Sequence, residues 1–284
     1  MAKRGTLAKL FRFVLYLFLF ILVVGGGALA GLVKSLEDSL PRINYNSYRP
    51  SLATKIYDLH GDIIATLHAE ENRVQLIPLS EIPDHLKHAV IATEDERFYQ
   101  HFGIDFEGIA RAAYHNWKSR RIAEGASTIT QQLARNAFLS LEITWRRKFK
   151  EMLLALRIER KYTKGEILEA YLNEIFFGHG THGVASAAQY YFGKPVSELN
   201  LAECALLAGL IRSPQRLSPY VNKKKSKQNQ LRVIQKMTEL GLITKQEAGE
   251  ARKATIVLRG RRKTRWKAPY FVTFVRNYLL EKYG

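Results

Sequence analysis

Residues 94–103 read EDERFYQHFG, residues 125–132 read GASTITQQ, and residues 147–151 read RKFKE. These three stretches bring the acidic residues Glu94 and Glu151, a run of hydroxyl and amide side chains, and a cluster of cations close together in the sequence. An uncharged apolar run, residues 13–33, precedes them. The combination indicates chemistry on an anionic substrate at a membrane surface.

Two further stretches follow in order. Residues 164–173 read KGEILEAYLN, and residues 183–188 read GVASAA, followed by YFGK at 191–194. In this order the five stretches closely resemble the peptidoglycan glycosyltransferases of family 51, which form the N-terminal part of class A penicillin-binding proteins. The resemblance is strong over residues 50–220.

The resemblance implies a mainly α, lysozyme-like two-lobed glycosyltransferase domain, with an N-terminal transmembrane helix and a short β-hairpin before the catalytic helices. A chain of 284 residues has room for one such domain and an anchor. The predicted division is a cytoplasmic basic tail (1–12), a transmembrane anchor (13–33), a linker (34–50), the glycosyltransferase domain (51–250) and a basic C-terminal segment (251–284). That last segment resembles the linker to a transpeptidase domain. Because the sequence contains no Ser-x-x-Lys or Lys-Thr-Gly motif, we do not expect penicillin to acylate this chain.

Local patterns support a helical domain with one hairpin. Residues 55–64 predict a hairpin that turns at His60-Gly61, and Pro83 at a first helical turn predicts a helix that ends near Glu94. Thr163 with Glu166 and Asn200 with Glu203 are typical of capping boxes at helix starts.

The run 13–33 has the roughly 20 apolar residues that a helix needs to cross a bilayer. Cations precede it, so the positive-inside rule places the amino terminus inside and the remainder outside. We therefore expect a single-pass protein of the bacterial cytoplasmic membrane, with its catalytic domain on the extracytoplasmic face. A cleaved signal peptide is the alternative, because Ala28-Leu29-Ala30 has the form of a cleavage site.

The net charge of +18, from 44 basic and 26 acidic residues, favours anionic partners such as lipid headgroups, diphosphates or nucleic acid. Charge alone does not choose among them. Trp117, Lys118, Arg120 and Trp145 mix aromatic and cationic side chains, as at a bilayer interface, although a core with a charged rim would look similar. The single cysteine, Cys204, lies in an apolar run and is predicted to be a core residue.

Glu94 is the first catalytic candidate. Near the carboxyl end of a helix, the negative pole of the helix dipole and partial burial would raise its pKa toward a value suited to a base. The resemblance implies that Glu94 is the family's general base. It would deprotonate the acceptor's 4-hydroxyl as that oxygen attacks the anomeric carbon of a lipid diphosphate with inversion.

Glu151 is the second catalytic candidate. Helical spacing puts it on a covered face with Arg147, Leu154 and Ile158. A carboxylate on such a face needs a partner, and Arg147, one turn earlier, is the simplest ion-pair partner. The resemblance implies that Glu151 helps to arrange the donor's diphosphate. It leaves open a divalent metal at Glu151, either Mg²⁺ or Mn²⁺, and implies no organic cofactor.

Other residues are expected to bind the substrate. Ser127, Thr128 and Gln131 suit a helix start whose hydroxyl and N–H groups accept a diphosphate, although an ordinary cap would look the same. The resemblance adds further residues, and the complete predicted set is Asp95, Ser127, Thr128, Gln131, Gln132, Arg135, Arg147, Lys148, Lys164 and Asn173. Lys164 and Asn173 could equally cap and terminate a helix, and Asp95 could simply form a loop.

Two positions depart from the family pattern. Arg135 stands where the family often has lysine, and Ile143 where it often has arginine. The first change replaces a point charge with a planar fork. The second removes one expected diphosphate contact, which Arg146 or Arg147 could replace.

The predicted function is polymerisation of lipid II into β-1,4 glycan strands with release of polyprenyl diphosphate. The expected partners are lipid II, the growing strand, the membrane and cell-wall synthesis or division proteins, but not nucleic acid. Moenomycin-type inhibitors should bind. Two alternatives stay open: a lytic, glycan-cleaving enzyme of lysozyme-like fold, and a catalytically silent recruitment anchor.

Overall fold

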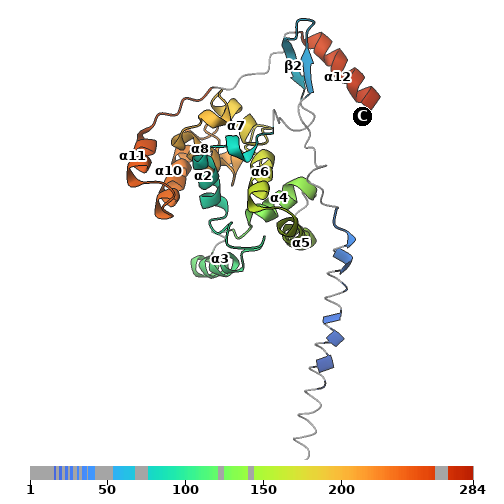
Figure 1. The fold of residues 1–284 in the computed structure, drawn as a ribbon, viewed down its shortest axis with the longest axis vertical. Coiled ribbons are helices and arrows are strands. Elements are labelled where there is room, and N and C mark those ends of the chain that lie inside the picture. The colour runs from blue at the N-terminus through green and yellow to red at the C-terminus, as the bar shows by residue number, and fades with distance from the viewer. Residues whose placement is uncertain are drawn as a thin grey trace, which may run out of the picture.

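The computed structural model describes residues 54–67, 76–120, 125–139, 144–259 and 268–283, with scattered positions between 16 and 41. The fold is mainly helical, as predicted (Figure 1). Its elements are β1 (Thr54–Tyr57), β2 (Ile63–Leu67), η1 (Leu79–Glu81), α2 (Asp84–Glu94), α3 (Phe106–Ser119), α4 (Ile129–Phe138), α5 (Trp145–Lys161), α6 (Lys164–Glu174), α7 (Val184–Tyr191), η2 (Val196–Glu198), α8 (Leu201–Leu210), α9 (Pro214–Leu217), α10 (Lys223–Glu239), α11 (Lys245–Lys253) and α12 (Pro269–Tyr283).

Most of the predicted transmembrane run, residues 13–33, lies outside the described residues. Within the described part of the chain, no helix combines the length and apolar character needed to cross a membrane. The anchor therefore stays a prediction.

The predicted hairpin is confirmed. Strands β1 and β2 pair antiparallel, with Ile56 opposite Ala65 and an irregularity in the pairing at Tyr57. The carboxylate of Asp58 accepts hydrogen bonds from the backbone N–H groups of His60 and Asp62, and Gly61 has a φ of +84°. Glycine suits this turn because it adopts positive φ without strain.

The structure also contains the helix starts that the sequence predicts. The capping boxes at Thr163 with Glu166 and at Asn200 with Glu203 both form. The predicted start of α2 is one residue early, because Pro83 is the residue that precedes the helix and Asp84 begins it.

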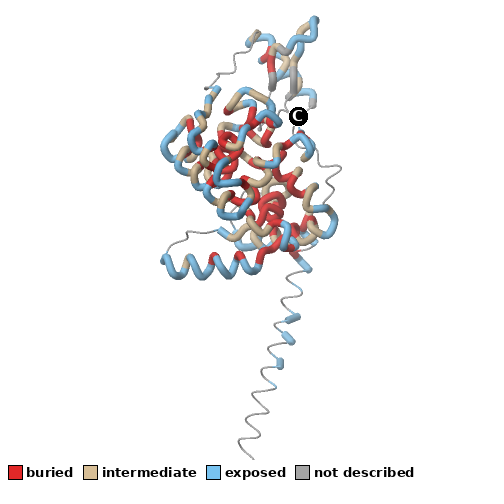
Figure 2. The backbone as a smooth tube through the Cα atoms, turned by 60° about the vertical axis from the view of Figure 1, so that its left-hand side comes forward, coloured by how far each residue is buried: buried red, intermediate tan, exposed pale blue. Residues whose placement is uncertain are grey.

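The core forms around α8, which α2 and α10 cover, while α4 packs on α5 and α6. Every residue of α8 from Ala202 to Leu210 is buried, as expected for a helix that is apolar all round. Figure 2 shows the buried positions concentrated in this helical body. Cys204 is a core residue, as predicted, and burial raises its pKa to about 12.

The predicted domain boundary at residue 250 falls inside α11. Beyond that helix, Ala254 and Ile256 still pack against the core, and the Arg259 N–H donates to the Tyr191 carbonyl at 2.9 Å. The helical body therefore continues to residue 259.

Asn173 ties α6 to the segment that leads into η1. Its amide accepts from Ile77 N at 2.9 Å and donates to Ile77 O at 2.8 Å, and both residues are buried. Asn173→Ala should lower the free energy of unfolding by about 1–3 kcal/mol, because it leaves these backbone groups unsatisfied. Urea unfolding measures this, with the exposed Asn277→Ala in α12 as the control. Equal stability of the two variants would contradict the assignment.

Candidate active site

A cavity of about 500 Å³ opens where α2, α3, α4, α8 and α10 meet. It is rich in charged and polar side chains, and its lining includes six residues of the predicted site. These are Glu94, Asp95, Ser127, Thr128, Gln132 and Arg135.

Glu94 is the last residue of α2, as predicted, and is half-buried. Its Oε2 accepts a hydrogen bond from Gln132 Nε2 at 2.9 Å. Burial raises the pKa of Glu94 above its ordinary value, and the Gln132 hydrogen bond and the charges of Arg212, Lys236 and Arg135 offset part of that rise. The carboxylate is therefore a better proton acceptor than an exposed glutamate would be.

Tyr171 orients the amide that holds Glu94. Its hydroxyl donates to Gln132 Oε1 at 3.1 Å, so the NH₂ group of Gln132 faces the carboxylate. Burial raises the pKa of Tyr171 well above its ordinary value, which keeps this donor neutral. The sequence analysis missed Tyr171, because its place in an apolar helical pattern is also typical of a core residue.

Asp95 joins the end of α2 to the start of α4. Its Oδ2 accepts from the Ile129 N–H at 2.9 Å, and its Oδ1 lies 2.9 Å from His101 Nε2. Because His101 Nδ1 accepts from the Gly103 N–H, Nε2 carries the proton and donates to Asp95. Asp95 therefore holds the backbone at the start of α4 close to Glu94, and it also lines the cavity.

The start of α4 lies between the two catalytic candidates. Thr128 caps the helix by accepting from the Gln131 N–H at 3.1 Å, and its hydroxyl donates to the Gly103 carbonyl at 2.7 Å. Gln132 faces Glu94, while Gln131 faces a second polar cluster.

This second cluster forms around Lys148 on α5. Its ammonium group donates to Ser127 Oγ at 2.9 Å, Gln131 Oε1 at 3.2 Å and Glu151 Oε2 at 2.9 Å. Arg147 Nε lies 3.1 Å from Glu151 Oε1, so the predicted ion pair forms. The sequence analysis did not anticipate that Lys148 would be a second partner of Glu151.

Glu151 is only 1% exposed and does not line the cavity, whereas the Lys148 side chain is 45% exposed. Lys148 therefore connects the buried carboxylate to Ser127 at the cavity wall. Glu151 acts on this wall by holding Lys148 in place.

A divalent metal at Glu151 does not fit these donors. Both carboxylate oxygens face cations, and the described residues contain no group of three acidic, histidine or cysteine side chains that could hold a metal. A requirement for Mg²⁺ or Mn²⁺ stays a prediction, and no step below uses one.

Cations from distant parts of the chain complete the cavity. Lys236 on α10 and Arg212 after α8 line it, and Lys236 Nζ lies 3.3 Å from Glu96 Oε2. Glu96 also pairs with Arg111 on α3. No signal in the sequence marked Lys236 or Arg212, because their place in the site depends on how α8 and α10 pack against α2.

Two predicted substrate-binding residues lie elsewhere. Lys164 donates to Glu159 Oε1 and to the His101 carbonyl, each at 2.7 Å, and Asn173 binds the backbone of Ile77. Neither residue lines the cavity. Of the two family departures, Arg135 lines the cavity and Ile143 lies outside the described residues. Arg146 and Arg147, which could replace the contact expected at Ile143, line a different pocket.

The sequence of this region matches a known family. A family model described as transglycosylase matches residues 60–238, a range that contains every predicted catalytic and substrate-binding residue. The chain belongs to the transglycosylase family. This membership confirms the resemblance that the five sequence stretches carry.

Curated relatives of this transglycosylase chain include penicillin-binding proteins 1A. Those of Aquifex aeolicus and Neisseria gonorrhoeae are each 41% identical, over 88% and 94% of this chain and 34% of their own lengths. That of Escherichia coli is 40% identical over 97% of this chain and 32% of its own length. The chain thus spans about a third of the length of these relatives. A crystal structure of penicillin-binding protein 1A from Haemophilus influenzae aligns with 83% of this chain and 25% of its own, at 25% identity and a TM-score of 0.49.

The raised pKa of Glu94 predicts a stability effect. The ionised form of Glu94 is less favoured in the folded chain than in the unfolded chain. Ionised Glu94 therefore lowers the free energy of unfolding at a pH above its pKa in the folded chain. This loss disappears as the pH falls below the pKa that Glu94 has in the unfolded chain. Glu94→Gln should therefore keep or raise the melting temperature at pH 7, and the difference from wild type should shrink toward pH 4. Thermal unfolding at both pH values tests this, with the exposed Glu250→Gln as the control. A marked loss of stability at pH 7 would show that the Glu94 carboxylate stabilises the fold.

Proposed function

We propose that this chain is a peptidoglycan glycosyltransferase that joins lipid II units into β-1,4 glycan strands. The observation that carries this proposal is the cavity in which the raised-pKa carboxylate of Glu94 faces cations, with the Lys148–Glu151 cluster joined to its wall through Ser127. Membership of the transglycosylase family supports it. Packing of α2, α8 and α10 on one side and of α4, α5 and α6 on the other supports a lysozyme-like, two-lobed domain.

Glu94 is the general base in this proposal. The acceptor's 4-hydroxyl oxygen forms a bond to the donor's anomeric carbon, the bond from that carbon to the diphosphate oxygen breaks, and the hydroxyl proton passes to Glu94. Attack from the face opposite the diphosphate inverts the configuration. Gln132, held by Tyr171, keeps the carboxylate in place.

The leaving polyprenyl diphosphate needs positive charge and hydrogen-bond donors. Ser127 and Thr128 line the cavity at the start of α4, where a helix N-terminus favours anions, and Arg135 in the last turn of α4 lines it as well. Lys148, held 2.9 Å from Ser127 Oγ, adds an ammonium group that is partly open to solvent. These groups would stabilise the charge that develops on the diphosphate.

The same cations weigh against the alternatives. A lytic enzyme that cleaves glycan has no diphosphate to neutralise, whereas Arg135, Arg212 and Lys236 all act on the environment of Glu94. A silent anchor would not require a carboxylate held in a cleft by an oriented amide. Nucleic acid binding has only the net charge in its favour.

The membrane is part of the proposal. On α3, Phe106, Ile109, Tyr114 and Trp117 are exposed, an apolar surface suited to contact with a bilayer that carries a lipid-linked substrate. We propose a single-pass protein of the bacterial cytoplasmic membrane with its amino terminus inside. Its further partners would be cell-wall synthesis or division proteins.

Polymerisation of labelled lipid II in detergent micelles tests the function. Glu94→Gln should lower the rate by about a hundredfold to ten-thousandfold because the base is lost, and a moenomycin-type inhibitor should stop the wild type. Lys148→Gln should also slow the reaction, while Glu250→Gln should not. Shortening of added glycan by the wild type would select the lytic alternative. A folded wild type without turnover would select the silent anchor.

The pH dependence tests the assignment of the base. Activity should fall as the pH drops through the raised pKa of Glu94, above the ordinary glutamate value of about 4.3. Because the charge of Lys236 lowers that pKa, Lys236→Gln should move the fall in kcat/KM to higher pH, while Lys236→Arg should move it much less. An unchanged profile in Lys236→Gln would mean that a different group titrates.

A further inference from the structure

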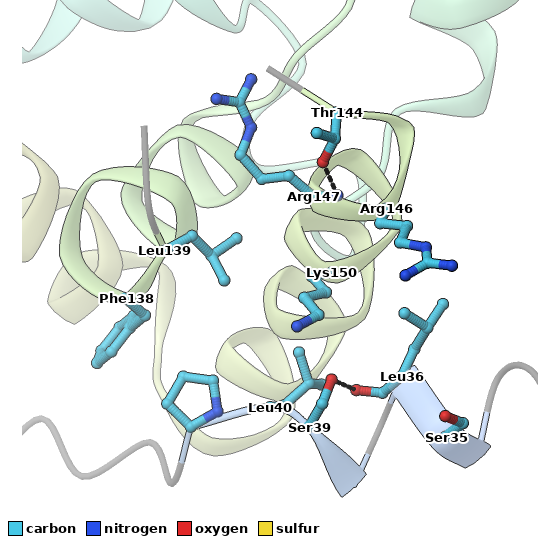
Figure 3. Close-up of a pocket in the computed structure, with 11 residues that line it drawn as sticks. Ser35, Leu36, Ser39, Leu40, Phe138, Leu139, Thr144, Arg146, Arg147 and Lys150 are labelled. Carbon is cyan, nitrogen blue, oxygen red and sulfur yellow. Dashed lines mark hydrogen bonds between the residues drawn. The ribbon is translucent and has the colours of Figure 1, made fainter. Parts of the chain in front are cut away.

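A second cavity, of about 690 Å³, lies between residues 35–41 and the α4–α5 connection (Figure 3). Its described lining residues share no member with those of the candidate active site. The mechanism proposed above makes no use of this cavity, so its side chains need a separate explanation.

One wall of the cavity is cationic. Arg146 and Lys150 on α5 line it together with Arg147, and no acidic residue is among its described lining residues. Arg147 is engaged by Glu151, and in Figure 3 its guanidinium points away from residues 35–41, whereas the Lys150 ammonium points toward them. Arg146 lies over the Trp145 ring, 5.5 Å from the ring centroid.

The position of these cations on α5 is electrostatically unfavourable by itself. Arg146 and Arg147 lie in the first turn of the helix, which contains no acidic residue and carries the positive end of the helix dipole. Thr144, which caps this end, also lines the cavity. An anion in the cavity would relieve this accumulation of positive charge.

The opposite wall is apolar. Leu36 and Leu40 come from the segment that directly follows the apolar run 13–33, and Phe138 and Leu139 come from the end of α4. In Figure 3, Leu40 lies below the Lys150 ammonium group, Phe138 and Leu139 lie to its left, and Leu36 lies to its right. The cavity therefore combines an anion-attracting rim with a surface suited to a hydrocarbon chain.

We propose that this cavity binds an anionic phospholipid of the surrounding membrane. The lipid phosphate would lie between Arg146 and Lys150, and an acyl chain would run along Leu36, Leu40 and Phe138. Basic pockets beside membrane segments bind anionic headgroups in this way. The bound lipid would join residues 35–41 to α5 and set the distance of the helical body from the bilayer.

Titration calorimetry of the whole chain in uncharged detergent tests the proposal. The probe is dihexanoyl phosphatidylglycerol, compared with dihexanoyl phosphatidylcholine and with inorganic phosphate at the same concentrations. Only the phosphatidylglycerol should bind measurably. Arg146→Gln/Lys150→Gln should weaken its binding roughly thirtyfold, because two cations near the phosphate are lost. Lys223→Gln/Lys224→Gln, which removes the same charge from the exposed start of α10, should leave binding unchanged.

Several outcomes would overturn the proposal. Equal binding of phosphatidylcholine would mean that the cavity binds acyl chains without discriminating between headgroup charges. Equal binding of inorganic phosphate would mean that it binds anions without recognising a lipid. Geranyl phosphate is a fourth probe: tighter binding that Arg146→Gln/Lys150→Gln weakens would assign the cavity to the lipid-linked substrate. Unchanged binding in Arg146→Gln/Lys150→Gln would place the lipid elsewhere on the chain, and no readout depends on glycan polymerisation.

Discussion

The contact between Asp95 and the first N–H group of α4 is the constraint on which the site depends. It fixes the start of α4 against the end of α2, so that Gln132 reaches Glu94 while Gln131 reaches Lys148. His101 holds the other oxygen of Asp95 and is held in turn by the Gly103 N–H. A short loop thus sets the geometry of the two clusters that the start of α4 contacts.

The two carboxylates of the site have different electrostatic surroundings. Glu94 has one amide donor and several cations at a distance, which leaves its pKa raised by burial. Glu151 is more deeply buried but has a cation at each oxygen. A base must be able to accept a proton, and the surroundings of Glu94 suit that task. Glu151 instead holds Arg147 and Lys148 in place.

Helix α5 also carries the cations Arg146 and Lys150, which line the second cavity. The face of α5 that carries Lys148 and Glu151 turns toward α4 and the candidate active site, while Arg146 and Lys150 turn toward residues 35–41. One helix therefore presents cations to two separate cavities. This explains how the first turn of α5 can be so basic when only part of that charge has a carboxylate partner in the described structure.

Much of the local structure was predictable because it depends on neighbours in the chain. The hairpin turn at Gly61, the caps at Thr163 and Asn200, and the covered face of Glu151 all follow from residue type and spacing. The sequence by itself thus determined the helical class, the family and the position of Glu94 at a helix end. Only the tertiary structure decided that Tyr171 orients Gln132, that Lys236 and Arg212 reach the cavity, and that Lys164 and Asn173 turn to internal contacts. These features depend on packing between helices far apart in the sequence, which no local pattern records.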